Sequence, residues 1–497
     1  MVGGTLGGPP AAEDAGTPAE EARSVSAPSL RSQLLRRKPV SAMVEETGAQ
    51  TDGGTLARRI GPVQLMGLGI GATIGTGIFF VLSTAVPEAG PAVVVSFVLA
   101  AVTAGFTALC YAELASTIPV AGSSYSYAYA TLGEVVAYVV GWCLVLEYAV
   151  SAAAVSVGWS EYLNALLDDT VGVRIPDALS AAPGAGGVVN LPAIVLVTLC
   201  ALLLVRGASE SARANAVMVG LKIVVLLFFA AIAFTAFDAG NYTPFAPTGV
   251  SGIGIAAASI FFSFIGLDAV STAGEEVRNP RRTLPLAIIG SLIVVTTVYL
   301  LVAVAAVGAQ PPARFEGQNA GLAAILEQVT GSRWPAIVLA AGAVISIFSV
   351  TLVVMYGQTR ILFAMSRDGL IPSLFSRVDR RTLTPVRGTV AVALFVGVLA
   401  GLVPLDFLVD LTSMGTLVAF TVVSIGVMVL RRTQPDLPRG FRVPGYPVVP
   451  VLSILFCLYL IYGLPGVTYA LFAVWLAIAA VVYVLYARTH SHLRTPR

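Results

Sequence analysis

The first long apolar segment, about residues 63–86, contains the stretch Gly67-Leu68-Gly69-Ile70-Gly71-Ala72-Thr73-Ile74-Gly75-Thr76-Gly77-Ile78-Phe79-Phe80. About 20 apolar residues suffice to span a bilayer. Five of the eleven residues from Gly67 to Gly77 are glycine, and each glycine inside a helix costs about 1 kcal/mol relative to alanine. Two interpretations stay open. Small residues allow tight helix packing, or the helix is discontinuous and its freed backbone groups hold a ligand at the membrane midplane.

The composition predicts an all-α polytopic membrane protein. The chain is 57% hydrophobic and only 11% charged, with a mean hydropathy of +0.87, whereas soluble proteins carry about 25% charged residues. The four cysteines lie singly in apolar segments, and the two histidines lie in the polar C-terminal tail. We therefore expect no metal site, no cofactor and no nucleic-acid partner. No set of residues typical of an enzyme active site is present, so we predict a protein that is not an enzyme.

Twelve apolar segments follow one another along the chain. They are residues 62–86, 91–118, 133–164, 190–206, 210–237, 250–272, 285–308, 334–366, 386–403, 405–431, 446–464 and 466–488. With the N-terminus inside, 25 of the 29 basic residues fall on the inner side, three fall on outer loops, and Lys222 lies within a segment. This bias follows the positive-inside rule. We expect twelve transmembrane helices in a plasma (inner) membrane, with both termini in the cytoplasm.

The sixth segment has an interruption of its own, Phe261-Phe262-Ser263-Phe264-Ile265-Gly266-Leu267-Asp268. Interrupted segments at matching places in two halves indicate an inverted-repeat transporter and its binding site. We therefore expect a first repeat at about 62–237 and a second at about 250–431. Together they form a core of residues 58–431, followed by two additional helices within 432–488. Residues 1–57 are predicted to be a disordered cytoplasmic tail, and residues 489–497 a cytoplasmic C-terminal tail.

Lys222 lies near the middle of the fifth segment, about 18 Å along a helix that starts near residue 210. Charged residues at this depth face the bundle interior and usually serve transport. Lys222 is therefore predicted to be a proton-coupling switch or a permanent substitute for a sodium ion. The alternative is a static structural ion pair.

Two of the carboxylates in apolar segments are also candidates for a specific role. Glu147 is central in the third segment, where it is expected to bind a cationic side chain or a proton, or to hold a neighbouring helix. Asp268 follows Gly266 where the sixth helix restarts. We expect it to satisfy free amides there, as an N-cap residue does.

The two interruptions together predict a receptor for a zwitterion. A helix that restarts after Gly75 offers the amides of Thr76 and Gly77 to an anion such as a carboxylate. The carbonyl of Thr73, with those of Phe262 and Ile265, would face an ammonium group. The complete set of predicted substrate-binding residues is Thr73, Ile74, Gly75, Thr76, Gly77, Phe262, Ser263, Ile265 and Glu147.

At these residues the chain resembles the amino acid–polyamine–organocation superfamily, and within it the cationic amino acid transporter family. The matching motifs are Gly71-Ala72-Thr73-Ile74-Gly75-Thr76-Gly77-Ile78-Phe79, Tyr111-Ala112-Glu113-Leu114, Pro119-Val120-Ala121-Gly122-Ser123-Ser124-Tyr125, Glu275-Glu276-Val277-Arg278-Asn279-Pro280 and residues 355–369. The resemblance implies a five-plus-five inverted-repeat fold and L-amino acids as substrates. It also implies that Lys222 matches the fifth-helix lysine that replaces bound sodium in proton-driven bacterial relatives. The preferred side chain is left open, because similar bacterial members handle cationic or neutral amino acids.

These observations predict a secondary active transporter that imports L-amino acids by proton symport through alternating access. One alternative is an amino acid exchanger or facilitator without proton coupling. Another is an amino acid sensor built on a transporter scaffold. The partners expected are the amino acid, the proton and the lipid bilayer, and the sequence leaves the oligomeric state open.

Overall fold

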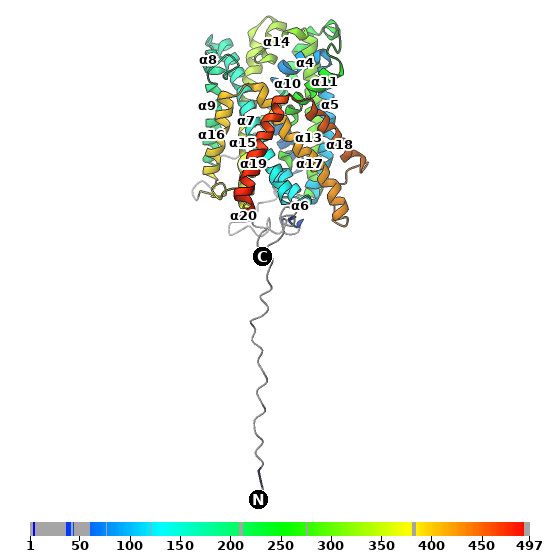
Figure 1. Cartoon of the computed structure of the whole chain (residues 1–497). Coiled ribbons are helices and arrows are strands. Elements are labelled where there is room, and N and C mark those ends of the chain that lie inside the picture. Colours follow the sequence, from blue (N-terminus) through cyan, green and yellow to red (C-terminus); the bar gives the residue numbers. More distant parts are fainter. Residues whose placement is uncertain are drawn as a thin grey trace.

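A computed structural model describes residues 3–4, 36–40, 43, 60–75, 77–120, 122–207, 212–274, 277–379 and 384–491. Side chains are described throughout these ranges except at residues 212 and 213. Every regular element in this part of the chain is helical. The long apolar helices stand side by side in one bundle, with α8 and α14 at one end and α6 and α20 at the other (Figure 1).

The first half of the bundle contains both short and very long helices. They are α3 (Pro62–Thr73), α4 (Val81–Ala89), α5 (Val93–Thr117), α6 (Ser123–Thr131), α7 (Glu134–Val171), α8 (Asp177–Ser180), α9 (Leu191–Val205) and α10 (Ala212–Ala233). The second half contains α11 (Gly249–Ile260), the 3₁₀ turn η4 (Phe261–Phe264), α12 (Ala269–Thr272), α13 (Pro280–Ala309), α14 (Gly321–Thr330), α15 (Arg333–Arg367), α16 (Val386–Leu402), α17 (Leu405–Thr433), α18 (Val448–Tyr462), α19 (Gly466–Val482) and α20 (Arg488–His490).

The described residues include eight helical stretches long and apolar enough to cross a membrane, and three shorter apolar helices, α9, α16 and α18. The protein is therefore an all-helical, multi-pass membrane protein, as its composition predicts. Each of the twelve apolar segments expected from the sequence coincides with one of these helices or with a pair of short helices. The arrangement as twelve crossings and two inverted repeats stays a prediction.

The centre of the bundle is α7, which packs against α15, α17, α16 and α9. It carries several small side chains, including the run Ala152-Ala153-Ala154, which is completely buried. Small residues let neighbouring backbones approach closely where lipid offers no hydrophobic driving force. A second group forms around α13, which packs against α5, α3 and α10. The two interrupted helices lie between these groups, because α3 also contacts α10, α12 and α15.

Most of the tail predicted over residues 1–57 lies outside the described residues. The structure differs from that prediction at residues 36–40 and 43, where Val40 and Met43 are 9% and 6% exposed and belong to the hydrophobic core. The physical reason is that this short piece carries two apolar side chains and a lysine that pairs with a buried carboxylate.

Candidate functional site

The first interruption lies between α3 and α4. α3 ends at Thr73, and the backbone turns through Ile74 and Gly75 before α4 begins at Val81. Gly75 has φ +116°, a left-handed conformation that glycine adopts most readily. A Cβ atom there would also lie 3.0 Å from the Val350 side chain of α15. The helix therefore ends where the backbone takes a conformation that favours glycine, and the sequence has Gly75 at that position.

The predicted ligand-binding residues of this segment are all buried where the structure describes them. Thr73 and Ile74 are 0% exposed, Gly75 and Gly77 are also buried, and Thr76 lies outside the described residues. Among the described residues, none accepts a hydrogen bond from the amide of Gly77 or Ile78. The carbonyl of Gly77 already accepts the amides of Phe80 and Val81, at 2.9 and 2.8 Å. Both amides lie in the turns before α4, which begins at Val81, so the helix restarts later than directly after Gly75.

The second interruption lies between α11 and α12. The helix tightens into η4, and Gly266 then takes φ +102° before α12 begins at Ala269. Phe262, Ser263 and Ile265 are buried in this segment. The carbonyl of Phe262 accepts the Ile265 amide at 3.2 Å.

The two interruptions pack directly against each other. A Cβ atom on Gly77 would overlap the Ser263 hydroxyl and lie 3.0 Å from the Phe262 ring. A Cβ atom on Gly266 would lie 2.7 Å from the Ala72 carbonyl oxygen. Each interruption therefore carries a glycine where the other approaches. The structure thus brings the two predicted groups of site residues together.

Lys222 of α10 reaches the first interruption. Its side chain is 0% exposed, and Nζ donates to the Gly71 carbonyl oxygen at 2.7 Å. Gly71 lies in the last turn of α3, where the helix dipole is negative and unpaired carbonyls favour a cation. The close approach of α10 depends on Gly71 itself, since a Cβ atom there would lie 2.8 Å from Asn215 Oδ1.

Tyr299 of α13 joins the two interruptions and was not predicted from the sequence. Its hydroxyl lies 2.9 Å from the Thr73 carbonyl oxygen and 3.0 Å from that of Ser263. A phenol has one proton to donate, so the two carbonyls share it. A buried tyrosine usually places its hydroxyl against a partner. From the sequence, a tyrosine within an apolar segment is expected to have a hydrogen-bond partner. The sequence does not show which groups are the partners of Tyr299.

Glu147 and Asp268 have different surroundings. Glu147 is 1% exposed, and neither carboxylate oxygen accepts a hydrogen bond from a described residue. The nearby Thr416 hydroxyl donates instead to the Thr412 carbonyl at 3.0 Å. A buried carboxylate without partners is costly. Glu147 therefore remains available to a proton or a cationic group.

The prediction that Asp268 caps α12 is wrong. Asp268 stands at the N-cap position, yet its side chain makes no capping hydrogen bond. Its carboxylate accepts the Tyr148 hydroxyl at 2.6 Å and the Ser123 hydroxyl at 3.3 Å. Long-range packing of α6 and α7 against this turn supplies better donors than the local amides, and the sequence spacing does not show that packing.

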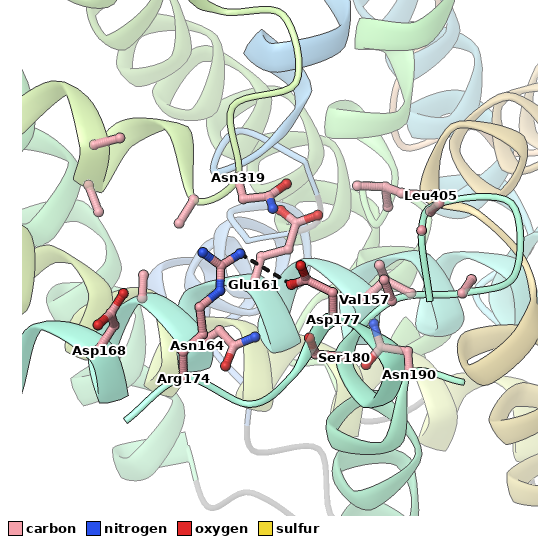
Figure 2. Close-up of a pocket in the computed structure, with 18 of the residues that line it drawn as sticks. Val157, Glu161, Asn164, Asp168, Arg174, Asp177, Ser180, Asn190, Asn319 and Leu405 are labelled. Carbon is pink, nitrogen blue, oxygen red and sulfur yellow. Dashed lines mark hydrogen bonds and ion pairs between the residues drawn. The ribbon is translucent and has the colours of Figure 1, made fainter. Parts of the chain in front are cut away.

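A separate cavity of about 410 Å³ is lined by residues of α7, α8 and α14, among others (Figure 2). None of the predicted site residues lines it. Five carboxylates and one guanidinium do, and Arg174 pairs with Asp177 at 3.3 Å. The lining charges are Glu161, Asp168, Asp169, Asp177, Glu327 and Arg174. The excess of negative charge would raise the local concentration of cations in this cavity.

The amino acid permease family model matches residues 60–487 of the chain. The chain belongs to this family. The permease is 46% identical over 424 residues to the branched-chain amino acid permease BcaP of Bacillus subtilis, covering 84% of this chain and 90% of BcaP. It is 43% identical over 421 residues to the methylthioribose transporter of the same organism, with the same shares covered.

A plant relative is similar as well. The vacuolar cationic amino acid transporter 2 of Arabidopsis thaliana is 38% identical over 410 residues, which cover 81% of this permease and 64% of the plant protein. The matched range includes both interruptions and Lys222. The permease family therefore extends over the part of the chain in which the candidate site lies.

Proposed function

We propose that this permease is a secondary active transporter that imports L-amino acids with protons, by alternating access across the plasma membrane. The observation that carries the proposal is the contact between the two interrupted helices at Gly77 and Ser263. Within a membrane, irregular backbone is tolerated only where protein buries it or where it lines a cavity. Half-helix ends at such a place bind the charged groups of a substrate.

The proposed layout has twelve crossings. The pairs α3–α4 and α11–α12 each open an inverted repeat, at residues 62–237 and 250–431, and α18 and α19 follow the ten-helix core. The support is the matching form of the two interruptions, each of which has one glycine at positive φ. Both termini would then face the cytoplasm, on the side where the sequence concentrates its arginines.

In the proposed substrate site, the amides of Thr76 and Gly77 bind the carboxylate and the carbonyls of Thr73, Phe262 and Ile265 bind the ammonium. The free Gly77 amide supports the first half. The carbonyls of Thr73 and Phe262 each accept a bond from the protein already. A carbonyl oxygen has two lone pairs, so that of Phe262 can accept a further bond from a ligand. Ile74, Gly75 and Ser263 complete the wall.

The side-chain end of the substrate is assigned to Glu147. The relatives are named for branched-chain amino acids, for methylthioribose and for cationic amino acids, so their names do not agree on one class. If the substrate is cationic, the unpartnered Glu147 carboxylate meets its charge. If it is neutral, Glu147 holds a proton instead.

Uptake into proteoliposomes tests this function. Leucine, arginine and methylthioribose are offered separately, with and without an inward proton gradient. We expect an amino acid to accumulate above its external concentration only when the gradient is present. Counterflow that ignores the gradient would support an exchanger or facilitator. Binding without uptake would support a sensor, and uptake of methylthioribose alone would overturn the substrate class.

A further inference from the structure

A short N-terminal segment, described at residues 36–40 and 43, packs against the end of the bundle that carries α6 and α20. Lys38 is 8% exposed, and its Nζ lies 3.2 Å from Asp368 Oδ1, just beyond the end of α15. Val40 and Met43 add buried apolar contacts. The segment is therefore held by both charge and apolar packing.

The backbone of this segment is also tied to the turn between α6 and α7. The Lys38 amide donates to the Tyr129 carbonyl at 3.2 Å, and the Glu134 amide donates to the Arg36 carbonyl at 2.9 Å. The Glu134 carboxylate accepts the Ser491 hydroxyl at 2.7 Å. Described residues from both ends of the chain thus meet at the first residue of α7.

Asp368 connects the segment to a second helix. Its other oxygen accepts the Tyr125 hydroxyl of α6 at 2.7 Å. One carboxylate therefore joins α15, α6 and the N-terminal segment. Removing one partner of a buried ion pair leaves the other charge uncompensated in a place with little water, which strongly favours separation of the elements.

The helices that this segment joins, α6 and α15, are among those that contact the two interruptions. α15 packs against Gly75 through Val350, and α6 reaches the second interruption through the bond from Ser123 to Asp268. A contact that fixes the ends of α6 and α15 therefore biases how both helices sit around the candidate site. Packed helices move as rigid elements, so this bias would extend along their length.

We propose that residues 36–40 and 43 belong to a latch that keeps the cytoplasmic side of the permease closed. Opening on that side requires Lys38 to leave Asp368. The latch rests on the proposed alternating-access function, which places this face in the cytoplasm. It assigns the N-terminal segment a part in the transport cycle, in place of the passive tail that its composition suggests.

Thiol labelling of the latch tests the proposal. Met43→Cys places a reporter in the latch, in a background from which the four buried cysteines are removed; these are Cys110, Cys143, Cys200 and Cys457. A membrane-impermeant maleimide is applied to the cytoplasmic face. We expect Asp368→Asn to speed labelling at least about tenfold, and the exchange Lys38→Asp with Asp368→Lys to slow it again.

Arg37→Ala is the matched control. Arg37 is exposed in the same segment, so its removal changes the net charge by one unit, in the opposite direction, and should leave the labelling rate unchanged. If Asp368→Asn is labelled at the same rate as its parent, or if Arg37→Ala accelerates labelling as much as Asp368→Asn does, the ion pair does not hold the segment in place.

The second arm asks whether the latch opens during transport. In the same vesicles, substrate is added on the far side, and labelling and uptake are both measured in the Met43→Cys protein. We expect uptake to accelerate labelling. Full uptake with unchanged labelling would show that the latch stays shut and would overturn the proposal. Absence of uptake would instead count against the proposed function. The labelling rate of Asp368→Asn would still show whether the ion pair holds the segment in place.

Discussion

The two interrupted helices are stabilised by groups of opposite charge. At the first, the C-terminal end of α3 receives the Lys222 ammonium on the Gly71 carbonyl. At the second, the N-terminal end of α12 carries the Asp268 carboxylate. The helix dipole makes a C-terminal end negative and an N-terminal end positive. Each helix end at an interruption thus lies beside a group of opposite charge. Asp268, however, bonds to side chains and not to the amides at the end of α12.

The difference lies in where the countercharge comes from. Lys222 belongs to another helix, α10, so relative motion of α10 and α3 changes its contact with Gly71. Asp268 belongs to the interrupted chain itself and is held by Tyr148 and Ser123. We infer that the first interruption is the one whose electrostatics change during a cycle, and that the second is a fixed reference.

Of the substitutions that test this difference between the interruptions, Lys222→Gln should lower transport most. Loss of a charge-assisted hydrogen bond costs about 1.5–3 kcal/mol, so we expect at least about a tenfold fall in proton-driven uptake. Lys222→Arg is the informative partner, since arginine keeps the charge but does not release its proton. It should retain counterflow and lose accumulation driven by a pH gradient. Gradient-driven accumulation by Lys222→Gln at the parent rate would contradict a coupling role.

Gly77→Ala should come next, because it pushes the two interruptions apart. The added Cβ atom overlaps the Ser263 hydroxyl, and overpacking of this kind costs about 1–3 kcal/mol. Thermal stability in detergent should fall together with substrate affinity. Gly67→Ala is the control, since a Cβ atom there meets nothing within 4 Å. Equal behaviour of the two variants would mean that the interruptions are not closely packed.

Tyr299→Phe removes the hydroxyl shared by the two interruptions. We expect weaker substrate binding, with a loss of about 0.5–1.5 kcal/mol for one neutral hydrogen bond. Tyr242→Phe is the control, because Tyr242 also bonds an α13 carbonyl, that of Val304 at 2.9 Å, at a distance from the site. Isothermal titration of both variants separates the effects. A matched loss of affinity in the two would assign Tyr299 a purely structural role.

Ser123→Ala should have the smallest effect. The bond to Asp268 is 3.3 Å long, and the shorter Tyr148 bond remains. A fixed second interruption predicts a loss within about 0.5 kcal/mol and nearly unchanged uptake. If uptake falls as much as in Lys222→Gln, the second interruption is not the fixed one of the two.

Much of the architecture was predictable because it depends on local composition. Glycines at Gly75 and Gly266 marked the interruptions, and a single cation among apolar residues marked Lys222. The role of Asp268 and that of Tyr299 depend on helices far away in the sequence, which no spacing rule brings together. The latch was missed because its few described residues form no periodic pattern, and the burial of Lys38, Val40 and Met43 depends on surfaces supplied by elements distant in the sequence.

The chain has only two lysines among its 29 basic residues, and both are buried, Lys38 at 8% and Lys222 at 0% exposure. Its other basic side chains are arginines, which ordinary acylating reagents leave unmodified. In this state both lysine amines are therefore shielded from such a reagent. Acylation of Lys38, detected by mass spectrometry, would report exposure of the latch, and acylation of Lys222 would report exposure of the centre of the bundle. The wild-type sequence thus contains two natural reporters of conformation at separate depths.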